Sequence, residues 1–97
     1  MEKLVLQSSV EFIGTFILLF VILARKGDPF SVGVALAAAL LFGAIWSGGH
    51  FNPAITVMSL VNDNKAMPVP KALMYIGAQV LAGLAALMLY KKLQKSA

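Results

Sequence analysis

The sequence has no cysteine and little charge, and both shortages restrict what the chain can do. Without cysteine there is no disulfide, no thiolate metal site and no thiol nucleophile. Only 12% of the 97 residues are charged, against about 25% in a soluble domain. The single histidine and the four acidic residues show no metal-ligand spacing and no Ser-His-Asp pattern. We therefore predict no metal site, no cofactor and no enzymatic activity.

The few charges are gathered into clusters that long apolar runs separate. The clusters lie near the N-terminus, at residues 25–28, at residues 63–71 and at residues 91–95. This pattern is typical of membrane spans joined by solvated loops. A nucleic-acid surface needs Lys and Arg gathered on one face and does not need apolar runs. We therefore expect a lipid bilayer as the environment and no nucleic-acid partner.

Three apolar runs approach the length of about 20 residues that crosses a bilayer in helical form. They cover residues 4–24, 29–46 and 70–90. Glu11 is the only charge inside the first run, and Arg25 follows that run where a signal peptide would have a cleavage site, so we predict a retained span. Asp28 and Pro29 are suited to cap and start the second helix.

Small residues recur every four positions in two of these runs. Such rows lie on one helix face and let helices approach closely in lipid. The rows consist of Ala35, Ala39 and Gly43 in the second run, and of Ala78, Ala82 and Ala86 in the third.

The segment 47–61 is predicted to enter the membrane without crossing it. Gly48 and Gly49 break the preceding helix, and Asn52 with Pro53 starts a new helix of about ten residues. Such a helix is roughly 15 Å long, half the hydrocarbon thickness. An Asn52 cap would use the side-chain oxygen and leave the NH₂ group as a donor. That donor, the loop carbonyls and the positive helix end favour neutral hydrogen-bonding molecules over cations.

Residues 47–54, Ser-Gly-Gly-His-Phe-Asn-Pro-Ala, resemble the first NPA loop of the major intrinsic protein family, the aquaporins and aquaglyceroporins. Residues 11–16, 32–46 and 75–79 resemble the first, second and third spans of the family. The likeness covers nearly all of the chain. It implies an all-α membrane protein in which residues 1–97 form a single half of an inverted-repeat fold, with three transmembrane helices and one re-entrant NPA half-helix. It also implies a passive channel for water, small neutral solutes such as glycerol, or both.

The resemblance implies a set of channel-lining residues and a smaller set that supports the loop. The lining set donates to the permeant, presents carbonyls to it, seats the half-helix or forms the filter, and it contains Gly48, Gly49, His50, Phe51, Asn52, Pro53, Ala54, Val32 and Ile55. The supporting set contains Glu11 and Gln79. Proton coupling is an alternative role for Glu11, because an intramembrane carboxylate is functional by default. For His50 the alternatives are a pH sensor and a packing histidine. The family filter usually has an aromatic residue where Val32 stands, and its arginine is absent from this chain.

The family fold has two inverted halves, and this sequence matches one of them. The second half would come from an inverted copy of this chain or from another chain, and a truncated half without channel activity stays open. Three basic residues are predicted on one side of the membrane and five on the other, a weak bias that permits insertion in both orientations. Complete spans and the basic tail favour an intact half, and the family's four-pore assemblies allow a higher oligomer.

Two other classes of membrane protein are compatible with parts of the sequence. A small dual-topology proton-coupled transporter would use Glu11, and a holin-like pore protein needs only the three spans. Neither class explains residues 52–54.

Overall fold

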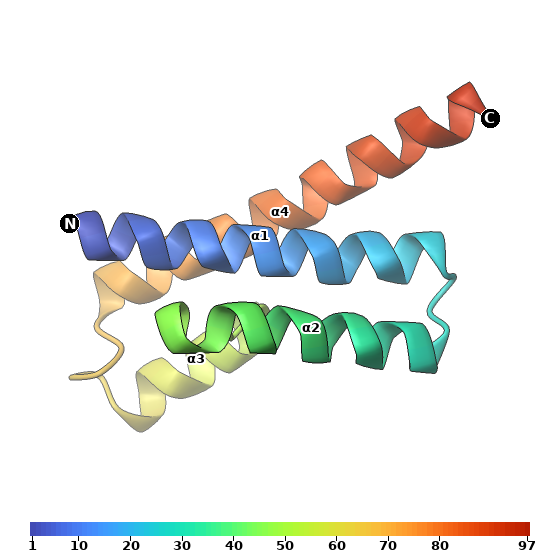
Figure 1. The fold of residues 1–97 in the computed structure, drawn as a ribbon. Coiled ribbons are helices and arrows are strands. Elements are labelled where there is room, and N and C mark those ends of the chain that lie inside the picture. Colours follow the sequence, from blue (N-terminus) through green and yellow to red (C-terminus); the bar gives the residue numbers. More distant parts are fainter.

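The computed structural model describes residues 1–97 as four helices without a β-strand (Figure 1). They are α1 (Glu2–Ala24), α2 (Pro29–Ser47), α3 (Pro53–Asn62) and α4 (Val69–Ser96). Three of them, α1, α2 and α4, are long and apolar enough to cross a membrane, and α3 is a shorter apolar helix. The predicted fold class is confirmed.

Local sequence signals explain where α2 begins and ends. Asp28 caps its first turn, because the Asp28 carboxylate accepts hydrogen bonds from the Ser31 backbone N–H at 2.9 Å and from the Ser31 hydroxyl at 2.8 Å. Pro29 occupies the first helical position, where its missing N–H costs nothing. At the other end Gly48 has a φ of 90°, a left-handed conformation that ends the helix.

Helix α4 continues to Ser96, whereas the predicted span ended at Tyr90. The apolar run stops there, but no proline or glycine follows, and the Lys, Leu and Gln residues of the tail are good helix formers. A hydrogen bond of 2.8 Å from Gln94 Nε2 to the Tyr90 hydroxyl joins successive turns of this extension. The helix is therefore longer than the apolar run that starts it.

Helix α1 lies between its two long neighbours, in contact with both α2 and α4, while α3 packs against α4. The small-residue rows lie at these contacts, as predicted: Ala39 on α2 is 2% exposed, and Ala82 on α4 is fully buried. Ala78 is only half-buried, so that row is less complete than expected.

The largest side chains in the interior of the chain carry polar groups, and its surface is largely apolar. The largest fully buried side chains are Tyr75, Gln79, Glu11, Thr15 and Thr56. Leu41 and Ile45 on α2, by contrast, are more than four-fifths exposed. A soluble protein has the opposite distribution. This arrangement suits a chain surrounded by lipid, because the buried polar groups must find partners inside the protein.

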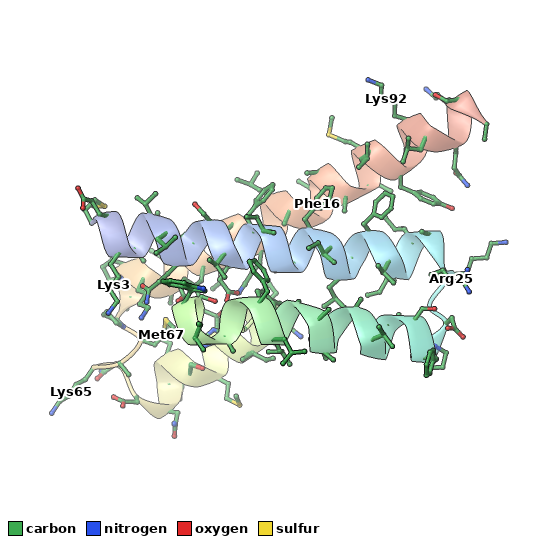
Figure 2. The ribbon with its side chains drawn as sticks, in the orientation of Figure 1. Lys3, Phe16, Arg25, Lys65, Met67 and Lys92 are labelled. Carbon is green, nitrogen blue, oxygen red and sulfur yellow. The ribbon has the colours of Figure 1, made fainter.

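Helix α3 runs back toward the end of the molecule at which α2 finishes and α4 begins (Figure 1). The chain thus enters and leaves the re-entrant segment at the same end. Figure 2 shows Lys3 and Lys65 at that end of the molecule, and Arg25 and Lys92 at the other. Basic residues thus lie at both ends of the molecule, as the sequence predicted.

Candidate functional site

The site is built on the five residues between α2 and α3, which follow an unusual backbone path. Gly48, Gly49 and Phe51 have φ values of 90°, 65° and 53°. Glycine adopts such angles without strain, but phenylalanine does so only when its surroundings hold it there. A Cβ on Gly49 would also lie 2.7 Å from Leu40 Cδ2 and 3.4 Å from Ala44 Cα, so a side chain here would displace Leu40 as well as strain the backbone.

The Glu11 carboxylate holds the inner side of this segment. Glu11 is fully buried and accepts four hydrogen bonds. Its Oε2 accepts from the Ser47 hydroxyl at 2.7 Å and from the His50 N–H at 3.0 Å. Its Oε1 accepts from the Phe51 N–H at 2.7 Å and from Gln79 Nε2 at 2.9 Å. These contacts from α1 satisfy two consecutive loop N–H groups, including that of the strained Phe51.

Further hydrogen bonds fix the end of α2 from which the segment departs. The Tyr75 hydroxyl donates to the Ser47 carbonyl at 2.7 Å, and Gln7 Nε2 donates to the Trp46 carbonyl at 3.2 Å. The Ser47 hydroxyl oxygen accepts from the Gly49 N–H at 3.1 Å. Both α1 and α4 therefore hold the polypeptide at the point where the helix ends.

The Phe51 side chain fills a slot that two glycines leave open. Phe51 is 2% exposed and packs with Val10 and Ala39. A Cβ on Gly43 would approach the Phe51 ring to 2.9 Å, and a Cβ on Gly14 would overlap it. The ring thus anchors the segment between α1 and α2, and the Phe51 side chain has a packing role in this chain.

A second hydrogen-bond network links the half-helix to α4 and to His50. Gln79 Nε2 donates to Thr56 Oγ1 at 3.0 Å, and Thr56 Oγ1 lies 2.8 Å from His50 Nδ1. The Tyr75 ring meets the His50 ring edge-on, with 5.3 Å between centroids. Through Gln79, this network connects His50 to the Glu11 carboxylate.

The outer side of the segment is unsatisfied within the chain. None of the four carbonyl oxygens of residues 48–51 accepts a hydrogen bond from the protein. Asn52 Oδ1 caps α3 by accepting from the Ala54 N–H at 2.8 Å, while Asn52 Nδ2 has no partner. Since such groups are costly in hydrocarbon, this side must meet water, a polar solute or another protein segment.

A groove of about 470 Å³ runs along this outer side. Six of the residues singled out from the sequence line it, together with Thr15, Gly83 and apolar side chains from α1, α2 and α4. The lining residues are Thr15, Leu18, Leu19, Ile22, Leu36, His50, Phe51, Asn52, Pro53, Ile55, Gln79, Val80 and Gly83. None of them is Lys, Arg, Asp or Glu, so the groove combines hydrogen-bonding groups with an apolar wall.

Four residues of the predicted lining set do not line this groove. Gly48 and Gly49 contribute the turn, and Ala54 lies exposed in the first turn of α3. Val32 lies on the first turns of α2, away from the loop in sequence and outside the lining set. A filter at Val32 would need facing residues that this chain does not place there, so that role stays a prediction.

Sequence reasoning missed several polar residues of the site. Ser47 and Thr56 flank the Asn-Pro-Ala motif, Tyr75 lies one turn before Gln79, and Thr15 lies one turn after Glu11. A spacing of four residues places Tyr75 on the same helix face as Gln79, and Thr15 on the same face as Glu11. That periodicity was the available signal for Tyr75 and Thr15. Nothing in the spacing indicated the contact between Thr56 and His50.

Curated relatives of the chain come from distant organisms. Glycerol uptake facilitator protein-like 6 of Lactiplantibacillus plantarum is 39% identical over 85 residues, which covers 78% of this chain and 38% of the relative. Aquaporin-B of Dictyostelium discoideum is 34% identical over 89 residues, which covers 78% of this chain and 30% of the relative. The chain thus spans about a third of the length of these relatives. No solved structure matches it significantly.

The family comparison agrees with the site. The Major intrinsic protein family model matches residues 27–97, which include the whole re-entrant segment, α3 and α4. This family consists of membrane channels and not of enzymes. The chain belongs to the major intrinsic protein family and is a multi-pass integral membrane protein.

Proposed function

We propose that the chain forms one half of a passive channel for water and small neutral solutes such as glycerol. The unsatisfied outer side of residues 48–52 carries this proposal. The unpartnered carbonyls of His50 and Phe51 and the free Asn52 Nδ2 donor belong to residues that line a groove without Lys, Arg, Asp or Glu. Such a surface replaces the hydration of a neutral molecule but offers little to compensate a dehydrated ion. The printed names of the two relatives, a glycerol uptake facilitator-like protein and an aquaporin, point to the same solutes.

The groove is open on one side, and this openness supports the need for a second half. Helix α3 packs only against α4, and its outward side chains remain uncovered: Met58 is 62% exposed and Val61 is 81% exposed. A half-helix whose N-terminal turn carries unsatisfied groups needs cover from protein or water. A second half-helix facing Pro53 and Ala54 would cover it and close the groove into a pore.

We propose that an inverted copy of this chain supplies the second half. The basic residues are divided between the two ends, with Lys3 and Lys65 at one and Arg25 and Lys92 at the other (Figure 2). Lys71 lies in the first turn of α4, on the side of the first pair, and the remaining three lie near Arg25 or Lys92 in the sequence. Three against five is a weak orientation signal, so insertion both ways is compatible with the sequence. Such a pair would place two Asn52 donors at its centre and two Ile55 side chains near them. It would have no filter arginine, and we expect it to pass glycerol as well as water.

Reconstitution of this chain alone tests both parts of the proposal. Proteoliposomes that contain only the 97-residue protein are mixed in a stopped-flow instrument with sucrose and with glycerol. We expect faster shrinkage in sucrose, and faster re-swelling in glycerol, than in empty vesicles of the same lipid. Permeability equal to that of empty vesicles would overturn self-pairing.

Topology mapping separates self-pairing from a second half supplied by another chain, and a pH gradient separates a passive channel from a proton-coupled transporter. Tags at both termini should be accessible from both sides of the membrane in comparable amounts if copies insert in both orientations. A passive channel should also conduct equally with and without a pH gradient. Uptake that requires such a gradient would favour the transporter instead.

A further inference from the structure

His50 borders two hollows on different sides of the re-entrant segment. One hollow is the groove beside Asn52. The other, of about 270 Å³, is lined by His50, Ser59, Asn62, Asp63, Ala66 and Met67, near the end of α3. A solute that passed between these hollows would meet the His50 ring, so the positions of its protons matter.

The Gln79 amide can adopt only one orientation. Glu11 Oε1, 2.9 Å from Gln79 Nε2, already accepts from the Phe51 N–H and needs a second donor. A flipped amide would place an oxygen against this carboxylate oxygen, with no proton between them. The Gln79 NH₂ group therefore faces Glu11. Its other hydrogen points to Thr56 Oγ1 at 3.0 Å.

This orientation leaves Thr56 with one proton to donate and one acceptor in reach. Thr56 is fully buried, so no bulk water can accept its hydroxyl proton. Its hydroxyl has two partners, Gln79 Nε2 and His50 Nδ1. Because the amide nitrogen is a donor, the Thr56 hydroxyl must donate to His50 Nδ1. If Nδ1 carried a proton, the Thr56 oxygen would face two donors, and the buried hydrogen of the Thr56 hydroxyl would have no acceptor.

We propose that the hydrogen-bond network of Glu11, Gln79 and Thr56 holds His50 as the neutral tautomer protonated at Nε2. In this tautomer the Nε2–H group is a second donor on the solute path, in addition to Asn52 Nδ2. His50 Nε2 makes no hydrogen bond within the protein, so its proton is free to meet a solute. The edge-on Tyr75 ring fixes the plane of the imidazole. Thr56 is a positioning residue, since it acts on a solute only through His50. The solute part of this proposal rests on the proposed channel function.

The single histidine of the chain makes the tautomer directly measurable. Solid-state NMR of proteoliposomes with ¹³C,¹⁵N-labelled histidine, at about pH 8.5 where imidazole is ordinarily neutral, gives one resonance for each ring nitrogen. We expect a protonated Nε2 and an unprotonated Nδ1 whose shift is that of a hydrogen-bond acceptor. A protonated Nδ1 in the wild-type protein would overturn the proposal.

Substitutions of Thr56 and Gln79 test the hydrogen-bond network that holds His50. In Thr56→Val the Nδ1 resonance should move to the position of a free imine nitrogen, whereas Thr56→Ser should keep the wild-type spectrum. Gln79→Met removes the amide donor, so the Thr56 hydroxyl can then accept a hydrogen bond from His50 Nδ1. The Nδ1 resonance should therefore change in this variant too. Gln79→Met replaces Thr56→Val as the test if the valine variant does not fold. An Nδ1 shift unchanged in both Thr56→Val and Gln79→Met would contradict the proposal.

Permeability measurements test the solute part separately. Water and glycerol permeability of Thr56→Val should fall about two- to tenfold, the range that one lost hydrogen bond represents, and Thr56→Ser should conduct like wild type. Unchanged permeability with the altered spectrum would overturn the role of Nε2 as a donor on the path. If wild-type vesicles conduct no better than empty ones, the proposed function fails, and the spectrum still decides the tautomer.

Discussion

The two sides of residues 48–52 differ in what satisfies their polar groups. On the inner side, the N–H groups of Gly49, His50 and Phe51 all find acceptors, two of them on the Glu11 carboxylate. On the outer side, the carbonyl groups of residues 48–51 and the side-chain nitrogen Nδ2 of Asn52 have no partner in the chain. The same short segment is thus rigidly held on one side and left available on the other. Preorganisation of this kind lets a site exchange hydrogen bonds with a solute without rearranging.

Removal of the inner acceptor should have the largest effect on stability. Glu11→Leu leaves two backbone N–H groups, the Ser47 hydroxyl and one Gln79 hydrogen without their acceptor. We expect a loss of about 3 kcal/mol or more, since each unsatisfied buried donor costs roughly 1–3 kcal/mol. Unfolding in mixed detergent and SDS micelles measures this loss.

Glu11→Gln is the matched control for that variant. It keeps one acceptor oxygen and places an NH₂ group where the other stood, so its stability should lie between those of Glu11→Leu and wild type. A leucine variant as stable as wild type would contradict the view that Glu11 holds the loop.

The second largest effect should come from closing the slot that holds the Phe51 ring. A Cβ on Gly14 would overlap the ring, so Gly14→Ala must displace Phe51 and with it the loop. Overpacking of this kind costs about 1–3 kcal/mol. Gly77→Ala is the control on α4, because no atom lies within 4 Å of its Cβ position, and it should change stability by about 0.5 kcal/mol or less. Equal effects of the two substitutions would refute the slot.

A smaller loss is expected where one hydrogen bond fixes the end of α2. Tyr75→Phe removes the donor to the Ser47 carbonyl and should cost about 1 kcal/mol. Tyr90→Phe removes a hydroxyl whose bond with Gln94 is exposed, so it should leave the unfolding midpoint unchanged. Similar midpoints for the two variants would show that the Tyr75 contact does not hold the segment.

The smallest effect should come from the turn between α1 and α2, far from the site. The Ser31 backbone N–H, and then its hydroxyl, donate to the Asp28 carboxyl and hold its pKa below its usual range. Because the folded-state pKa is depressed, this stabilisation is present above the unfolded pKa and is lost as pH falls through the folded one. Wild-type protein should therefore lose slightly more stability than Asp28→Ala between pH 5 and about pH 3. Parallel pH profiles of the two proteins would exclude this contribution.

Most of the fold could be predicted from the sequence because membrane helices carry strong local signals. Apolar runs, the Asp28-Pro29 and Asn52-Pro53 starts and the glycines after Ser47 gave the helices close to their observed ends. The exception is the end of α4, where the helix outlasts the apolar run. Hydropathy marks where a chain meets lipid, whereas helix propensity decides where the helix stops.

The site could be predicted only in part. Glu11 stood out because a charge is rare within an apolar run, Asn52 because it starts the half-helix, and Gln79 because its segment resembles the third span of the family. The contact of Thr56 with His50, and the slot that Gly14 leaves for Phe51, depend on how α1, α3 and the loop pack together. Spacing along one helix does not contain that information. The filter role of Val32 needs residues from a second half and remains a prediction.

The substitution Asn52→Asp tests most directly whether the outer side of the loop acts on solutes. Aspartate caps a helix as well as asparagine does and suits its positive end, so the unfolding midpoint should stay close to that of wild type. The variant nevertheless loses the free NH₂ donor and places a negative charge beside the groove. Stopped-flow light scattering should then show water and glycerol permeability reduced toward that of empty vesicles. An Asn52→Asp protein that conducts as well as wild type would contradict the account.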